Sequence, residues 1–316
     1  MLRYTLTRFG AMLLTMFMIM SLSFWIIRLM PQSIFENPEV APEVQRLLEA
    51  EMHLDKPMVV QYYYFIRDIV TKGDFGRSVK LRPGMEVFKV VATRIKPSVV
   101  LNFFSLIMAV PAGIILGTIA ALQRNKLADN IVSFLVVIFI SVPSFVFGAV
   151  LQYTFTFRIP IFPTLYDASA QTFGQMFHSL TLPIIALALG PVATIARYLR
   201  GELIETLSSE FLLLARTKGL TRTQAVVRHA FRNSMIPIAN TVIPMITGIM
   251  GGSLVIERIF AVPGMGGQLV QSIVVGDQFL TVALLMFYSA VSLVTIFIVD
   301  ISYGLIDPRI RVGGGK

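Results

Sequence analysis

Residues 98–122 read SVVLNFFSLIMAVPAGIILGTIAAL, a run of 25 residues that contains no charged side chain. An α-helix rises about 1.5 Å per residue, so about 20 apolar residues cross the roughly 30 Å hydrocarbon core of a bilayer. The run is therefore long enough and apolar enough to form a transmembrane helix, and it predicts lipid as the solvent of this part of the chain.

Five further runs of similar length lie elsewhere in the sequence, at 9–30, 131–153, 179–199, 236–256 and 279–303. No small-residue cleavage site follows the first run, so we expect it to be retained as a transmembrane helix. The sequence thus predicts an all-α fold, a polytopic membrane bundle of six transmembrane helices.

Prolines distinguish two of these runs from the rest. Pro183 and Pro191 lie in the fourth run, and Pro237 and Pro244 in the fifth. We expect the other four helices to be continuous. A broken helix at membrane depth is stable only where protein or a water-filled cavity satisfies its free backbone groups. The fourth and fifth runs are therefore predicted to lie inside the assembly and to line a translocation pathway. The candidate pathway residues are Gly190, Pro191, Pro244, Gly248 and Glu257.

The composition excludes several classes of function. Hydrophobic residues make up 55% of the chain and charged residues only 14%, too few charges to cover a soluble domain of this size. The formal net charge is +9, but the basic residues lie beside apolar runs and form no stripe with aromatic residues, so no nucleic-acid partner is expected. The chain has no cysteine, which excludes disulfides and thiolate chemistry.

The distribution of Lys and Arg predicts the orientation. Basic residues gather at the N-terminus (Arg3, Arg8), in the loop 123–130, in the segment 200–235 and in the C-terminal tail. Six spans place all four segments on one side, and short loops rich in Lys and Arg are cytoplasmic. We therefore expect a multi-pass protein of the cell membrane, plasma or inner, with both termini in the cytoplasm.

The same topology predicts three regions. Residues 1–30 form the N-terminal transmembrane helix, residues 31–97 a small extracellular region, and residues 98–316 a core of five transmembrane helices. The extracellular region carries ten Lys and Arg against nine acidic residues. Loops longer than about 60 residues cross the membrane largely regardless of charge, so this composition is compatible with an outer location.

The segment 208–237, SSEFLLLARTKGLTRTQAVVRHAFRNSMIP, is the most informative polar stretch. Gly219 separates two helical pieces and suits a left-handed helix C-cap, and Thr221 suits the N-cap of the second piece. A basic amphipathic helix–turn–helix of this kind lies on a membrane surface or docks in the groove of a partner. The pattern alone leaves both possibilities open.

Three motifs together resemble a known family. Ala215-Arg-x-Lys-Gly219 is followed by Arg228-His-x-x-Arg-Asn-x-x-x-Pro237, and further on by Glu257-Arg-Ile-Phe-x-x-Pro-Gly-Met-Gly266 and Asp307-Pro-Arg-Ile-Arg311. In this order they resemble the permease subunits of ABC importers of the oligopeptide/dipeptide type, and the resemblance covers the whole chain.

That resemblance implies that the loop 200–235 carries a coupling helix that seats in an ATPase subunit. The residues implied to couple are Ala215, Arg216, Lys218, Gly219, Leu220, Arg228, His229, Arg232 and Asn233. The general permease signature begins Glu-Ala-Ala here, whereas this chain has Leu213 and Leu214 before Ala215. The departure argues against any role that needs an acid at position 213.

The resemblance further implies the partners and the cargo. It implies a second, homologous permease, two cytoplasmic ABC ATPases that use ATP and Mg²⁺, and an extracellular substrate-binding protein, with membrane lipid around the bundle. Peptides are the substrate class that the resemblance to this branch implies first, but the same branch includes importers of nickel, glutathione and sugars. Specificity in such systems lies largely in the external receptor.

The sequence itself offers no site for chemistry. No Gly-x-x-x-x-Gly-Lys-Ser/Thr motif occurs, and the histidines His53, His178 and His229 are not grouped, so we expect no bound cofactor, no metal site and no ATPase activity in this chain. An ion-coupled secondary transporter would carry acids at membrane depth and symmetric repeats, and a membrane-embedded enzyme would carry convergent polar groups. Neither pattern is present.

Two features of the sequence each allow two interpretations. Glu257 and Arg258 are read first as a pair that reaches the outer membrane interface and second as a gate contact on the substrate route. The pattern Gly113-x-x-x-Gly117 allows close helix packing, either within the chain or at a subunit seam.

Overall fold

The computed structural model describes residues 2–29, 49–50, 53–247 and 253–306, and these residues form helices joined by turns and loops. Within the described residues no strand occurs beyond one isolated bridge between Arg77 and Glu86. The predicted all-α class is confirmed. The chain divides into two compact units, one of residues 1–97 with 263–316 and the other of residues 98–262.

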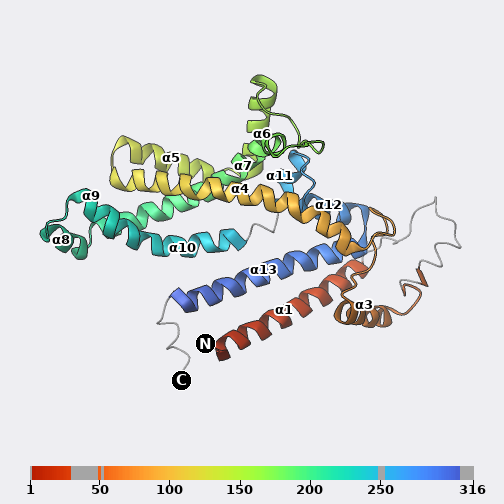
Figure 1. Ribbon diagram of the computed structural model, residues 1–316. Coiled ribbons are helices and arrows are strands. Elements are labelled where there is room, and N and C mark those ends of the chain that lie inside the picture. The colour runs from red at the N-terminus through yellow and green to blue at the C-terminus, as the bar shows by residue number, and fades with distance from the viewer. Residues whose placement is uncertain (1, 30–48, 51–52, 248–252, 307–316) are drawn as a thin grey trace. The chain divides into compact units, whose positions relative to one another are not determined.

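The first unit is built on two long helices that lie side by side, α1 (Leu2–Leu29) and α13 (Gln278–Ile306) (Figure 1). Buried Met20 and Ile27 of α1 pack against Val282 and Met286 of α13. The unit also contains α3 (Met58–Lys72), α12 (Met265–Val275) and the first part of α4 (Val87–Leu122). The helix α3 packs against α1 because its aromatic and aliphatic side chains repeat at helical spacing.

The second unit is built around α7 (Phe173–Leu207), against which α5 (Leu127–Ser141), α6 (Ser144–Gln152), α10 (Arg232–Thr247) and α11 (Leu254–Ile259) all pack. A short π-helix, η1 (Tyr153–Arg158), continues α6. Three more elements, α8 (Glu210–Thr217), α9 (Arg222–Ala225) and the π-helix η2 (Val226–Phe231), join α7 to α10.

Four helices are long and apolar enough to cross a membrane, and a bent pair brings the number to five if it counts as one span. The four are Tyr4–Leu29, Val87–Leu122, Phe173–Leu207 and Gln278–Ile301. The run 236–256 includes residues outside the described part, between the end of α10 and the start of α11, so the count of six remains a prediction. The helix α4 begins at Val87, eleven residues before the expected start of the second run at residue 98.

The expectation that the third run is continuous was wrong. The chain bends by 101° between α5 and α6. The cause is Pro143, which lacks a backbone N–H and disfavours helical backbone at the residue before it. Val142 accordingly adopts φ −93° and ψ 125°, an extended conformation.

The expectation that prolines break the fourth run was also wrong. Pro183 and Pro191 both lie inside the single continuous helix α7. Its central position in the unit nevertheless agrees with the predicted interior location. In its most apolar window 61% of the residues are buried, against 22% in each of the other three membrane-length helices. Packing by neighbouring helices, rather than a break, therefore places this run inside.

Close packing of α4 on α7 depends on glycine. A Cβ added at Gly117 would lie 2.7 Å from the carbonyl oxygen of Ala196, and one at Gly113 would lie 2.7 Å from Cβ of Ile195. Only a residue without a side chain allows the two backbones to approach this closely. The glycine pair therefore serves helix packing within the chain, the first of the two alternatives.

Candidate functional site

The turn at Gly219 is built from two backbone hydrogen bonds. The N–H of Gly219 donates to the carbonyl of Arg216 at 3.0 Å, and the N–H of Leu220 donates to the carbonyl of Ala215 at 3.3 Å. These are the two bonds of a Schellman motif, which ends a helix with a residue of positive φ. Gly219 has φ +93°, as the predicted C-cap requires.

The second helical piece begins with a capping box. The side chain of Thr221 accepts the backbone N–H of Gln224, and the side chain of Gln224 accepts the backbone N–H of Thr221. Both donors would otherwise lack a partner at the helix start. Because α8 is closed by Gly219 and α9 is opened by Thr221, the reversal between them is fixed by local chemistry, as the sequence predicted.

The segment 208–237 has one buried side and one exposed side. On the buried side, Leu212, Ala225 and Ala230 pack against Leu203 at the end of α7, and Ala215 is buried as well. The exposed side carries the apolar residues Phe211, Leu213, Leu214 and Val227 and the basic residues Arg216, Lys218, Arg222, Arg228 and Arg232. An exposed surface that mixes large apolar groups with cations is suited to contact a partner.

The departure from the general loop signature has a structural explanation. Ala215 is buried with 8% of its surface exposed, whereas Leu213 and Leu214 are 62% and 56% exposed. The position that matches the signature is therefore the buried one. The two differing positions face outward, where substitution does not disturb the fold.

His229 and Arg228 lie on η2, in a π-helical stretch between α9 and α10. Such stretches are uncommon and are often found at functional sites. Both side chains are exposed, as are those of Arg232 and Asn233 at the start of α10. The structure therefore brings the predicted coupling residues together on one loop, with Ala215 facing inward and Leu220 half-buried.

The predicted pathway residues are dispersed over three elements. Gly190 and Pro191 lie in the middle of α7, and Pro244 lies near the end of α10 with an exposed ring. Gly248 lies outside the described residues. A Cβ added at Gly190 would meet no atom within 4 Å, so α7 leaves open space beside this residue.

The interpretation of Glu257 and Arg258 as a pair at the membrane interface was wrong for Glu257. Its side chain is completely buried and accepts the hydroxyl of Ser98 at 2.6 Å and the backbone N–H of Ser253 at 3.3 Å. Arg258 is exposed. The carboxylate therefore fixes the start of α11 against α4.

Two buried carboxylates were not singled out by sequence reasoning. Asp129, at the start of α5, pairs with Arg200 of α7. Asp277 caps α13 through the N–H of Leu280, and it also accepts the hydroxyl of Ser78 at 2.5 Å and the backbone N–H of Leu81 at 3.0 Å. The only hint of Asp277 in the sequence is its position just after Gly276 and before an apolar run, where an N-cap is expected.

Within the described residues no group of three or more His, Asp or Glu side chains could hold a metal ion. His53 stacks on Tyr64, with ring centroids 4.0 Å apart, and His178 lies against Phe162. These histidines are thus placed by aromatic contacts, and His229 is exposed on η2.

The sequence of this chain is similar to known proteins along nearly its full length. Residues 113–312 match the family described as binding-protein-dependent transport system inner membrane component, and residues 1–85 match the N-terminal family of the same transport systems. The dipeptide transport system permease protein DppB of Lactococcus lactis is 38% identical over 99% of this chain and 100% of its own. The oligopeptide transport system permease protein OppB of Escherichia coli K12 is 34% identical over 98% and 100%.

Solved structures support the fold. A structure of the MetNI methionine ABC transporter matches with a TM-score of 0.54 at 16% identity, over 70% of this chain and 97% of the other. An amino acid ABC transporter structure matches with a TM-score of 0.54 at 15% identity, over 69% and 94%. The chain belongs to the family of binding-protein-dependent transport system inner membrane components.

Proposed function

We propose that this family member is the permease subunit of an ATP-driven ABC importer that carries peptides into the cytoplasm. The support for peptides comes from the relatives named as dipeptide and oligopeptide permeases, which align over almost the whole of both chains. Nickel, glutathione or a sugar, which importers of the same branch also carry, is the alternative substrate. The expected assembly contains a second permease, two ATPase subunits and an external binding protein.

The observation that carries the coupling role is the two-sided segment 208–237. Its buried side fastens it to the end of α7 through Leu203, so that a force on the loop is transmitted to the most buried of the four membrane-length helices. Its exposed side offers leucines and cations to a partner. Energy from ATP hydrolysis in the partner would move this loop, and α7 would shift with it.

Coupling of this kind requires that two distant sites favour the same conformational state. The loop responds to the nucleotide state of the ATPase, and the substrate contacts the helices near Gly190. The permease therefore needs no nucleotide site of its own. Its affinity for substrate can stay modest when an external receptor captures the ligand.

The test is ATP-driven uptake of a labelled dipeptide by proteoliposomes that contain the complete complex. Leu214→Asp places a charge on the exposed face of α8, where it should weaken the contact with the ATPase without disturbing the buried side. We expect strongly reduced uptake and less ATPase subunit recovered with the permease. Leu165→Asp, at a 48% exposed leucine outside this loop, is the control and should transport normally.

Orientation is tested separately, because the chain lacks cysteine. Gln171→Cys should react with an impermeant thiol reagent in intact cells, whereas Arg124→Cys and Thr223→Cys should not. All three side chains are exposed, and none of them caps a helix or has positive φ, unlike Asn125 and Thr221. Reaction of Thr223→Cys from outside would contradict both the orientation and the coupling role.

A further inference from the structure

The unit of residues 1–97 and 263–316 contains a cavity of about 160 Å³ that none of the residues discussed above as coupling or pathway candidates lines. It lies between the end of α1, the helix α3, the turn that follows α3 and the start of α13. Its volume is about five times the ~30 Å³ share of one water molecule in the liquid. That is enough for the terminal residue of a short peptide.

One wall of the cavity carries the guanidinium of Arg28. Its Nη1 donates to Oε1 of Gln278 at 2.9 Å, and its Cζ lies 5.4 Å from the ring centroids of both Phe24 and Phe279. In the described part of the chain, no carboxylate pairs with Arg28. A guanidinium has five N–H donors in a planar fork, so Gln278 leaves most of them for another acceptor. A carboxylate is the group whose two oxygens match that fork.

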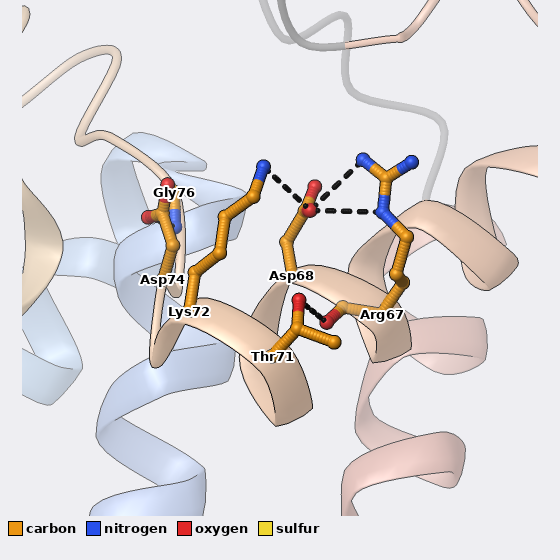
Figure 2. Close-up of polar contacts among 6 residues, drawn as sticks. All are labelled: Arg67, Asp68, Thr71, Lys72, Asp74 and Gly76. Carbon is orange, nitrogen blue, oxygen red and sulfur yellow. Dashed lines mark hydrogen bonds and ion pairs between the residues drawn. The ribbon is translucent and has the colours of Figure 1, made fainter.

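Acidic side chains line another part of the same cavity. Figure 2 shows Asp68, whose Oδ1 accepts Nε and Nη2 of Arg67 at 3.1 and 2.9 Å and pairs with Nζ of Lys72 at 3.1 Å. Partial burial opposes ionisation of Asp68, but hydrogen bonds from Arg67 and Lys72 outweigh it and hold the pKa of this carboxyl below its usual value. Asp68 is therefore charged at neutral pH.

Asp74 adds a second acid beside it, in the turn after α3. Its Oδ1 accepts the backbone N–H of Gly76 at 2.8 Å, and its side chain is exposed to solvent. The second oxygens of Asp68 and Asp74 make no hydrogen bond within the described part of the chain. The lining also contains the aromatic residues Tyr64, Phe65 and Phe75 and a second cation, Arg77, whose Nη1 donates to the carbonyl of Gly84 at 2.9 Å. The cavity thus combines a guanidinium with donors to spare, carboxylates and aromatic rings.

We propose that this cavity binds the C-terminal residue of a short peptide, with the peptide carboxylate on Arg28 and the side chain among the aromatic rings. Asp74, which forms no ion pair within the described residues, then favours peptides short enough to bring their free ammonium group within reach, whereas Asp68 already pairs with Arg67 and Lys72. The choice of a peptide as the ligand rests on the proposed function. The charge arrangement and the aromatic lining come from the cavity itself.

The single tryptophan of the chain makes the site directly observable. Trp25 follows Phe24 in α1, with ring centroids 5.9 Å apart, and it contacts Tyr62 of α3 at 5.7 Å. The full chain is reconstituted in lipid nanodiscs without other subunits, and Ala-Leu, Ala-Leu amide and acetyl-Ala-Leu are titrated while Trp25 emission is recorded. Equilibrium dialysis with labelled peptide measures the same binding without relying on fluorescence.

We expect saturable binding of Ala-Leu and about tenfold or more weaker binding of its amide, because the amide removes a charged hydrogen-bond acceptor. Arg28→Gln should abolish this preference, and Arg28→Lys, which keeps the charge but loses the fork, should reduce it. Arg8→Gln is the matched control, since Arg8 lies on the same helix, pairs with Asp300 at 3.3 Å and does not line the cavity. It should leave the preference intact.

Asp74→Asn tests the role of this carboxylate. It should weaken the binding of Ala-Leu and leave the binding of acetyl-Ala-Leu unchanged. Equal binding of the acid and the amide, an Arg28→Gln variant that still prefers the acid, or no binding by either method would each overturn the proposal. Uptake by the assembled importer is measured in parallel. If import persisted while the cavity bound no peptide, the proposed site would be refuted and the proposed function would not.

Discussion

Arg200 holds the carboxylate of Asp129 at two points, with Nε 2.6 Å from Oδ1 and Nη2 2.8 Å from Oδ2. Asp129 also accepts the backbone N–H of Asn125 at 2.9 Å and is only 2% exposed. Two-point contacts between arginine and carboxylate are among the stronger hydrogen-bonded pairs in proteins. This pair fixes the turn between α4 and α5 to α7, seven residues before that helix ends at Leu207.

Removing either partner should destabilise the unit, because the other charge is then left without its partner. Asp129→Ala is expected to cost about 2–4 kcal/mol, somewhat less than a fully buried pair, since the side chain of Arg200 is 33% exposed. Thermal unfolding of the purified complex measures the loss. Ser133→Ala, which removes only a 3.4 Å contact to the same carboxylate, is the control and should change little.

The double variant decides whether the pair itself is responsible. Asp129→Ala with Arg200→Ala should lose about 1–3 kcal/mol less than the sum of the two single losses. If the two losses of unfolding free energy were additive, Asp129 and Arg200 would act independently. Their contact would then be close in space without being energetically coupled.

The space beside Gly190 gives a test of the substrate pathway. The Cβ that Gly190→Val adds would meet no atom within 4 Å, so we expect near-normal thermal stability but reduced uptake. The Cβ added by Gly10→Val in α1 would also meet no atom within 4 Å, and this variant should reduce neither thermal stability nor uptake. Gly117→Val is the opposite case, because its Cβ would lie 2.7 Å from a backbone oxygen and overpacking costs about 1–3 kcal/mol. Unimpaired uptake by Gly190→Val would remove Gly190 from the pathway.

Asp68 predicts a pH dependence of the packing of α3. Its pKa is lowered in the folded state, so its stabilising effect is complete above the unfolded pKa and is lost as the pH falls through the folded value. Hydrogen exchange of the α3 amides should therefore be faster in Asp68→Asn than in the parent chain at pH 7. The two should become alike only after the pH has fallen below this lowered pKa, and the effect at pH 7 should stay under about 1 kcal/mol, since Lys72 is well exposed.

If the exchange difference persisted under acid, the charge of Asp68 could not be its cause. Asp167→Asn provides a comparison outside α3. The pKa of Asp167 is also lowered, by hydrogen bonds from Ser169, but both residues lie in the loop 159–172, away from α3 in the sequence. This variant should leave exchange in α3 unchanged at every pH.

The sequence predicted the helical class because apolar runs of membrane length have few other stable conformations. It also predicted the Gly219 turn, where positive φ and capping are properties of neighbouring residues. It failed at Pro143 and at Pro183, which have the same local chemistry. Whether a proline breaks a helix depends on how the surrounding helices pack, and no local pattern carries that information.

Buried charges were missed for a related reason. Asp129 and Arg200 are 71 positions apart and look like ordinary residues of segments rich in Lys and Arg. Asp277 lies 199 positions from Ser78. Glu257 was recognised as part of a motif but assigned to a membrane interface, because its partner Ser98 belongs to another helix. Pairings of this kind exist only after the helices have packed.

Gly219 gives the sharpest test of the coupling segment. At φ +93° any side chain other than glycine's costs about 1–2 kcal/mol, because its Cβ approaches the backbone carbonyl that follows. No other atom lies within 4 Å of that Cβ, so the cost is one of backbone conformation alone. The strain falls on the reversal between α8 and α9 and does not touch the long helices.

We therefore expect Gly219→Val to reach the membrane in normal amount but to import little peptide. Less ATPase subunit should co-purify with it. Gly219→Asn should be milder, since asparagine adopts positive φ more readily and valine is also stiff at χ1. Gly201→Val is the matched control, a glycine inside α7 that also has open space around it and lacks positive φ. Normal import and normal ATPase recovery by Gly219→Val would show that the shape of this turn does not matter for coupling.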